Sequence, residues 1–267
     1  MKRILFIIII ILSLLFLYGK YIEPNNIKLK DYTIKYENIP ESFKELKIVQ
    51  FSDILYKQDN KKLEKLQKEI NNLSADILIF TGDLFDNNYT YTDSDYNYLK
   101  EFLNNLNANY YKYTVYGEND EKYLDKFKDI MYDSGFKLLD NESNLLFYKD
   151  ITPIKIIGVT SNTADINKLL ESDIEYSYSL VITHKPDNIE LLSNYNINAV
   201  LAGHSLGGII NVPYYGGLIK MDGSNTYINN YYKVNNTDLY ISNGLGYKLF
   251  EFRLFNTPSI NVYRFDN

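Results

Sequence analysis

Side chains that can bind metal ions follow five short apolar runs of this sequence. The five stretches read "FSDIL", "FTGDLFDN", "YGEND", "ITHKPD" and "LAGHSLGG", and together they contain both histidines of the chain. A single acidic residue after a strand is usually a helix cap or a turn residue, and a lone histidine is more often structural than a ligand. Five such strand ends in one chain favour a shared site, where carboxylates, amides and imidazoles would bind a divalent cation.

Strands and helices alternate between these stretches. Apolar runs predict strands at 46–51, 76–80, 111–117, 154–159, 179–183, 198–202 and 238–242. Apolar residues at helical spacing, together with stop signals, predict helices at 61–73, 93–106, 121–134 and 186–195. The alternation predicts a layered α/β fold, in which loops at the carboxyl ends of the strands aim side chains at a common point.

The N-terminus has the layout of a membrane anchor. Lys2 and Arg3 precede an apolar stretch from Ile4 to Leu17 that only Ser13 interrupts. A cleavable signal peptide looks similar, but no small-x-small motif follows, so an uncleaved signal anchor over residues 1–20 is favoured. Basic residues before the apolar stretch predict a single-pass protein of the cell membrane with its domain on the extracytoplasmic side. Residues 21–45 form a lead-in segment, and residues 46–267 form the main domain.

Composition excludes several classes of function. At 267 residues the chain fits one large domain behind the anchor, and its net charge is −6. No dense Lys/Arg run is present, so no nucleic-acid partner is expected. The absence of cysteine excludes disulfides, thiolate metal sites and thiol catalysis.

The order of the motifs resembles that of the calcineurin-like metallophosphoesterases, and more narrowly their membrane-anchored bacterial branch. That family carries D-x-H, G-D, G-N-H-D/E, a histidine followed by x-P, and G-H-x-H-G-G. The corresponding residues here are Asp53-Ile54-Leu55, Gly82-Asp83, Gly117-Glu118-Asn119-Asp120, His184-Lys185-Pro186 and Gly203-His204-Ser205-Leu206-Gly207-Gly208. The resemblance covers nearly the whole chain. It implies two facing mixed β-sheets flanked by helices, with a two-metal centre at the strand ends.

The departures from the family pattern fall mainly on one metal position. The resemblance implies that this position uses Asp53, Leu55, Asp83 and Leu206, but leucine has no donor atom. The other position uses Asp83, Glu118, His184 and His204, all of which can coordinate a divalent cation. We therefore expect one metal per chain (Mn, Zn or Fe), held by Asp53, Asp83, Glu118, His184 and His204, with Leu55 and Leu206 packed against each other.

The proton donor of the family is also replaced. Asn119 stands where the resemblance implies a histidine that protonates the leaving group, and an amide cannot act as a general acid near neutral pH. Asn119 and Asp120 are thus the candidate catalytic residues, Asp120 only if its pKa is raised.

Three interpretations follow. The first is a metal-dependent phosphoester hydrolase with reduced or altered activity. The second is an inactive surface-anchored binding or scaffold protein that keeps one structural metal. The third is an unrelated α/β protein with His184 and His204 as core residues. For the first, the substrate is a phosphate-containing small molecule or an envelope component, such as a lipid headgroup, a nucleotide-linked sugar or a cell-wall phosphate.

Overall fold

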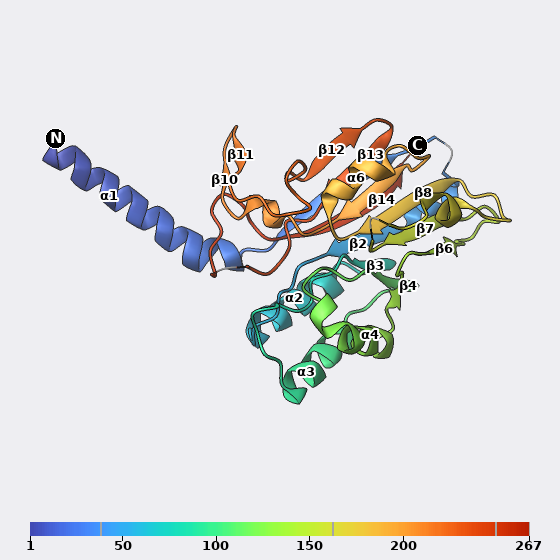
Figure 1. Cartoon of the computed structure of the whole chain (residues 1–267), viewed down its shortest axis with the longest axis horizontal. Coiled ribbons are helices and arrows are strands. Elements are labelled where there is room, and N and C mark those ends of the chain that lie inside the picture. The colour runs from blue at the N-terminus through green and yellow to red at the C-terminus, as the bar shows by residue number, and fades with distance from the viewer. Residues whose placement is uncertain (38, 162, 249, 267) are drawn as a thin grey trace.

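Two β-sheets face each other, and helices cover the outer face of each (Figure 1). This architecture comes from a computed structural model that describes residues 1–37, 39–161, 163–248 and 250–266. Both sheets contain parallel and antiparallel neighbours. The expected α/β fold with two mixed sheets flanked by helices is therefore confirmed.

The first sheet joins the two ends of the domain. Its strands are, in spatial order, β1 (Lys28–Lys35), β14 (Ser259–Asp266), β2 (Lys47–Phe51), β3 (Ile77–Phe80), β4 (Tyr111–Thr114) and β5 (Lys137–Leu138). Strands β2 to β5 are parallel, and β14 enters antiparallel to β2. Because β1 pairs with β14 along its full length, part of the lead-in segment belongs to this sheet.

The second sheet has a parallel centre and antiparallel edges. Its strands are, in spatial order, β12 (Tyr231–Val234), β13 (Thr237–Ile241), β9 (Ala199–Ala202), β8 (Tyr178–Thr183), β7 (Ile154–Val159) and β6 (Glu142–Leu146). A separate short hairpin consists of β10 (Asn211–Val212) and β11 (Gly216–Gly217).

The helices follow the apolar patterns of the sequence. The first sheet is covered by α2 (Asn60–Asn72), α3 (Asp93–Asn104) and α4 (Leu124–Asp133), and the second by α5 (Ile166–Leu170) and α6 (Ile189–Leu192). Single-turn helices lie at Glu41–Glu45, Glu121–Tyr123, Pro186–Asn188 and Leu206–Gly208.

Alternating side chains of the strands contribute to separate cores on the two faces of each sheet. In β3, Leu78 and Phe80 pack under the helices, whereas Ile77 and Ile79 face the second sheet. Successive side chains of a strand point to opposite faces, so a buried strand needs apolar residues at every position. This explains why "ILIF" is apolar throughout. Burial of both faces also fixes the orientation of β3, and with it the position where the next loop begins.

The N-terminal helix projects away from the domain (Figure 1). Helix α1 (Lys2–Leu17) continues through Tyr18–Ile22 and Glu23–Asn25, and the whole run Lys2–Asn25 is long and apolar enough to cross a membrane. Its end is attached to the domain: the buried Glu23 carboxylate accepts hydrogen bonds from the backbone N–H of Phe255 at 2.7 Å and of Asn256 at 2.6 Å.

Candidate metal centre

The five loops singled out in the sequence meet at one edge of the two sheets. Three residues of these loops, Asp53, Asp83 and His204, have left-handed backbone φ angles of 53°, 59° and 64°. Such a conformation costs a non-glycine residue of order 1–3 kcal/mol and persists where the surrounding structure enforces it. Strain concentrated at three converging loops is typical of a functional site.

Three of the five predicted ligands bring their donor atoms together. One ligand atom each from Asp83, His184 and His204 lies within 4.8 Å of the others, and all three residues are buried. Asp83 Oδ2 is 3.2 Å from His184 Nε2, which in turn is 3.2 Å from His204 Nδ1. One carboxylate and two imidazoles form a donor set that suits Zn, Mn or Fe.

Backbone carbonyls fix the orientation of both imidazole rings. His184 Nδ1 lies 2.7 Å from Thr81 O, and His204 Nε2 lies 2.8 Å from Asp222 O. A carbonyl oxygen only accepts hydrogen bonds, so each of these ring nitrogens must carry a proton. In the neutral rings the lone pairs therefore sit on the other two nitrogens, which point toward each other and toward Asp83. Histidines that bind metals commonly donate their second N–H to a carbonyl in this way.

These convergent acceptors require a positive charge between them. Burial acts to raise the pKa of the Asp83 carboxyl, but the adjacent His184 ring lowers it to about 2. Burial acts to lower the pKa of His184, yet the Asp83 charge and hydrogen bond raise it to about 10. Burial and the neighbouring His184 charge lower the pKa of His204 to about 4. A proton on His184 supplies the charge in the absence of a cation, and the residues present fit a divalent cation in its place.

Asp53 lies beside this group but has other partners. Its Oδ2 accepts the backbone N–H of His204 at 3.0 Å, and its side chain is 1% exposed. Burial raises the pKa of Asp53 to about 6, although the charge of His184 acts in the opposite direction. We expected a metal to compensate this carboxylate. Its assignment as a ligand stays a prediction.

Glu118 is held by two lysines. Its carboxylate lies 3.0 Å from Lys185 Nζ and 2.8 Å from Lys248 Nζ. Burial acts to raise the pKa of Glu118, but the hydrogen bond from Lys248 and the other nearby positive groups lower it to about 2. Glu118 would have to exchange an ammonium group for a cation in order to join the metal centre, so this assignment also stays a prediction.

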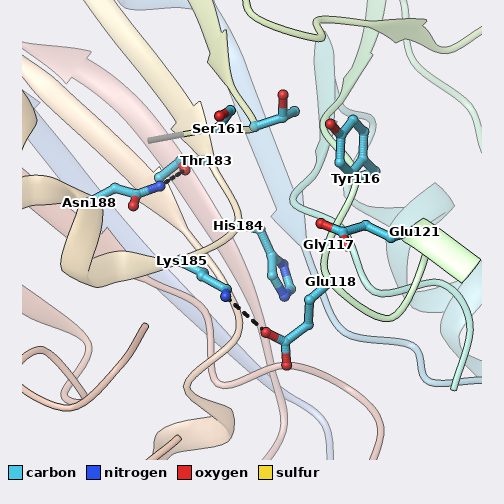
Figure 2. Close-up of a pocket in the computed structure, with 10 residues that line it drawn as sticks. Tyr116, Gly117, Glu118, Glu121, Ser161, Thr183, His184, Lys185 and Asn188 are labelled. Carbon is cyan, nitrogen blue, oxygen red and sulfur yellow. Dashed lines mark hydrogen bonds and ion pairs between the residues drawn. The ribbon is translucent and has the colours of Figure 1, made fainter. Parts of the chain in front are cut away.

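A polar cavity opens beside Glu118 and His184 (Figure 2). It encloses about 340 Å³, and Figure 2 shows the side chains of Lys185, Glu118 and His184 at one end of it. The remaining lining residues are mostly polar and come from the strand ends of both sheets and the segments that follow them: Tyr116, Gly117, Glu121, Thr160, Ser161, Thr183 and Asn188. The cavity is large enough for a phosphorylated small molecule and lies directly against the candidate metal centre.

Asn119 is turned toward the metal centre. Its Nδ2 donates to Asp83 Oδ2 at 2.5 Å, and its backbone N–H donates to Asp83 Oδ1 at 2.9 Å. The amide thus orients the carboxylate of Asp83. A glycine is needed two residues earlier, because a Cβ on Gly117 would lie 2.2 Å from Asp83 Oδ1.

Asp120 lies behind the metal centre and is fully buried. Its Oδ2 accepts the backbone N–H groups of Asp83 at 2.8 Å and Gly117 at 2.9 Å. Its Oδ1 accepts those of Leu84 at 2.9 Å and Phe85 at 3.1 Å. Burial and the charge of Asp83 raise the pKa of Asp120 to about 7, while the hydrogen bonds act to lower it. This carboxylate joins the loop after β3 to the loop after β4.

Leu55 and Leu206 belong to one buried apolar cluster, as the sequence predicted. Ile209 completes it, and Ile210, Ile219 and Met221 pack against its edge. Both leucines have left-handed φ angles, 47° for Leu55 and 44° for Leu206. The cluster lies next to Asp53, because a Cβ on Gly244 would come within 2.8 Å of Asp53 Cβ and 2.6 Å of Leu206 Cδ2.

Sequence reasoning missed the basic residues around the site. Lys248 lies 130 residues after Glu118 in the chain. The buried Arg253 guanidinium donates to the carbonyls of Asn243 at 2.7 Å, Gly244 at 3.1 Å and Gly246 at 2.6 Å. Both residues lie in the stretch "NGLGYKLFEFRLF", which resembles the family, and its charged residues were the available signal.

Comparisons with known proteins agree with this geometry. A family model described as calcineurin-like phosphoesterase matches residues 46–208. The chain is 31% identical over 254 residues to the uncharacterized metallophosphoesterase YkuE of Bacillus subtilis, covering 92% of this chain and 88% of that protein. It is 26% identical over 276 residues to the uncharacterized metallophosphoesterase YkoQ of the same organism, covering 99% of this chain and 100% of that protein.

A relative with a named activity is more distant. The chain is 24% identical over 258 residues to the UDP-2,3-diacylglucosamine pyrophosphatase LpxG of Chlamydia muridarum, covering 75% of each chain. The region that the family model matches, residues 46–208, contains the converging loops that hold Asp83, His184 and His204. The motif order, the two facing sheets and these matches together show that the chain belongs to the calcineurin-like phosphoesterase family.

Proposed function

We propose that this chain is a membrane-anchored phosphoester hydrolase with one divalent cation, bound by Asp83, His184 and His204. One observation carries the proposal. The two imidazoles donate their outer N–H groups to Thr81 O and Asp222 O, so their inner nitrogens and the Asp83 carboxylate converge as acceptors. A bound cation would polarise a phosphoryl oxygen of the substrate. Asp53 and Glu118 complete the proposed ligand set if they give up their present partners.

The second cation position of the family is proposed to be lost. The apolar cluster of Leu55 and Leu206 supports this, because it fills the space next to Asp53 with side chains that offer no donor atom. Positive charge near Asp53 then comes from the protein itself. Both Lys248 and Arg253 interact electrostatically with its carboxylate.

The chain's own residues set the expected rate. Lys185 borders the cavity and can pair with a phosphate oxygen if it leaves Glu118. Asn119 donates to Asp83 and offers no titratable proton to a leaving group. Loss of a general acid typically lowers the rate by about 10²- to 10⁴-fold, so we propose slow hydrolysis.

The substrate is proposed to be an anionic phosphoester of the cell envelope. The polar cavity beside Lys185 supports a phosphorylated ligand, and the apolar helix Lys2–Asn25 supports a location at the membrane. The name of the Chlamydia relative also supports an envelope substrate, since that protein is described as a pyrophosphatase of a diacylated sugar nucleotide. Placement of the domain on the extracytoplasmic side is part of the proposal.

One observation favours a second candidate function, a catalytically silent binding protein with a structural metal. Glu118, which lines the cavity, is held by two lysines, and Asn119 is hydrogen-bonded to Asp83, so both side chains are already engaged. A protein of this kind would bind metal and ligand without turnover.

Metal content measured together with hydrolysis tests both candidates. Full-length protein loaded with Mn²⁺ and dialysed should retain one equivalent, and His184→Ala or His204→Ala should lose it. Asp222→Asn is the matched control, because its side chain lies near the site but is 98% exposed. Hydrolysis of an aryl phosphodiester above the level of Asp83→Asn supports the hydrolase, and its absence at full metal loading supports the binding protein. Zero or two equivalents would contradict the single-cation centre.

A further inference from the structure

An exposed apolar face surrounds the point where the N-terminal helix enters the domain. The hairpin β10–β11 carries Tyr214, Tyr215 and Leu218, with exposed fractions of 110%, 80% and 48%. The segment 250–257 adds Phe250 at 58% and Phe255 at 51%. Large side chains this exposed on one part of a surface mark a contact site rather than ordinary surface.

Backbone hydrogen bonds hold the hairpin and the helix end on one short segment. The N–H of Arg253 donates to Gly19 O at 2.9 Å, and the N–H of Asn211 donates to Leu254 O at 2.9 Å. Ile210 and Leu254 also form an isolated parallel bridge. Figure 1 shows β10, β11 and the end of α1 together at the left of the domain. The base of the hairpin and the end of the helix are therefore both hydrogen-bonded to the pair Arg253–Leu254.

Aromatic contacts continue from the helix onto this face. The ring of Phe16, in α1, stacks on that of Phe252 at 5.7 Å, and the ring of Phe252 lies 5.7 Å from that of Phe250. The buried ring of Phe252 thus connects Phe16 of the helix to Phe250, which is exposed on the domain.

The charge of the hairpin suits a bilayer surface. Residues 209–221 read "IINVPYYGGLIKM" and contain no carboxylate and one lysine, in a chain where 23% of residues are charged. Tyrosine is enriched at the boundary between lipid headgroups and acyl chains, because its ring is apolar and its hydroxyl remains hydrated.

We propose that the hairpin β10–β11 and the side chains of Phe250 and Phe255 insert into the headgroup region of the bilayer that holds the helix. The domain then rests on the membrane instead of swinging from a single linker. Because the hairpin follows Leu206–Gly208 directly in the chain, the metal centre lies one loop away from the lipid surface. The inference rests on the membrane anchor of the proposed function and is independent of hydrolysis.

Single tryptophans test the contact, since the natural chain contains none. Full-length Tyr215→Trp, Phe6→Trp and Tyr132→Trp variants are reconstituted into phosphatidylcholine nanodiscs, with and without lipids brominated at a shallow or a deep acyl position. Phe6 lies in the helix and is 65% exposed, whereas Tyr132 lies on α4 and is 84% exposed. Tyr215→Trp should show blue-shifted emission and stronger quenching by the shallow than by the deep bromines, and Phe6→Trp, near the start of the helix, should also be quenched. Tyr132→Trp should show neither.

The outcomes separate the docking face from the anchor. Quenching of Phe6→Trp without quenching of Tyr215→Trp would overturn the docking face and leave the anchor intact. Absence of quenching in Phe6→Trp would overturn both. A blue shift of Tyr215→Trp that depends on protein concentration and resists bromine quenching would assign the face to a second copy of the chain, and the proposal would fail.

Discussion

Replacing Asp120 with asparagine tests what the most buried carboxylate of the site does. In the parent, its two oxygens accept four backbone N–H groups, from Asp83, Gly117, Leu84 and Phe85, at 2.8 to 3.1 Å. The amide of Asp120→Asn retains one oxygen that accepts hydrogen bonds. Its NH₂ group cannot accept a hydrogen bond, so the two backbone N–H groups that face it lose their acceptor. Two hydrogen bonds to a charged group are lost, each contributing about 1.5–3 kcal/mol.

The expected cost is therefore about 3–6 kcal/mol of unfolding free energy. For a domain of this size, 1 kcal/mol shifts the melting temperature by about 2–4 °C, so Asp120→Asn should melt at least about 6 °C below the parent. Circular dichroism during heating and during denaturant titration measures both quantities. Asp129→Asn on α4 is the matched control, because Asp129 is exposed and its loss should leave the melting temperature unchanged.

The same variant separates a scaffold from a proton donor. Burial and the charge of Asp83 raise the pKa of Asp120 to about 7, and a protonated Asp120 would be the general acid that Asn119 cannot be. If the four N–H donors keep it ionised, Asp120→Asn loses stability and metal affinity together, since three of the four donors belong to the loop that carries Asp83 and at least one of those bonds is lost. A variant that melts with the parent and keeps its metal but loses hydrolysis would refute the scaffold role.

Three further predictions concern the end of the N-terminal helix, the charge of the site and the metal position that we propose to be filled. Glu23→Gln should lower the unfolding free energy by about 1.5–3 kcal/mol in denaturant titrations, because one of two charge-assisted backbone hydrogen bonds is lost, whereas the exposed Glu64→Gln should have no effect. With chelator present, the parent should lose stability relative to His184→Gln as the pH rises from 6.5 to about 10. The pKa of His184 is raised in the folded state, so its protonation stabilises the fold fully below pH 6.5, and this stabilisation disappears as the pH approaches 10. Parallel stability–pH curves would contradict this. Leu55→His combined with Leu206→His should raise bound Mn²⁺ above one equivalent by elemental analysis, and unchanged occupancy would show that the pocket has lost more than two ligands.

The sequence predicted the elements whose apolar pattern is local. Strand β3 is apolar at all four positions, and α2 presents Leu63, Leu66 and Ile70 at helical spacing. Strand β1 was not predicted, because it lies at a sheet edge and Ile34 is its only buried residue. Its partner β14 lies at the other end of the chain, and no local pattern reports that pairing.

The candidate site divides in the same way. The motifs placed Asp83, His184 and His204 correctly at the strand ends, because each strand fixes where its own loop begins. They could not show that Glu118 faces Lys185 and Lys248, since Lys248 comes from a distant part of the chain. Which side chains pair between distant segments depends on the tertiary fold, and the local spacing of residues does not reveal it.

Residues 243–248 and 250–257 contact two features that the family motifs leave apart, the N-terminal helix and the apolar cluster of Leu55 and Leu206. On one side, Arg253 and Phe255 receive the end of the helix through Gly19 and Glu23. On the other side, the N–H of Gly246 donates to Asp53 O at 2.6 Å, and the Arg253 side chain holds the carbonyls of this loop. The buried Arg253 guanidinium should hold this loop firmly in place. Breaking any of its hydrogen bonds to the carbonyls would leave a buried polar group unpaired, which is unfavourable. Arg253 also interacts electrostatically with the buried Asp53 carboxylate, alongside the adjacent His184 ring, so one residue links the end of the N-terminal helix to the charge of the site.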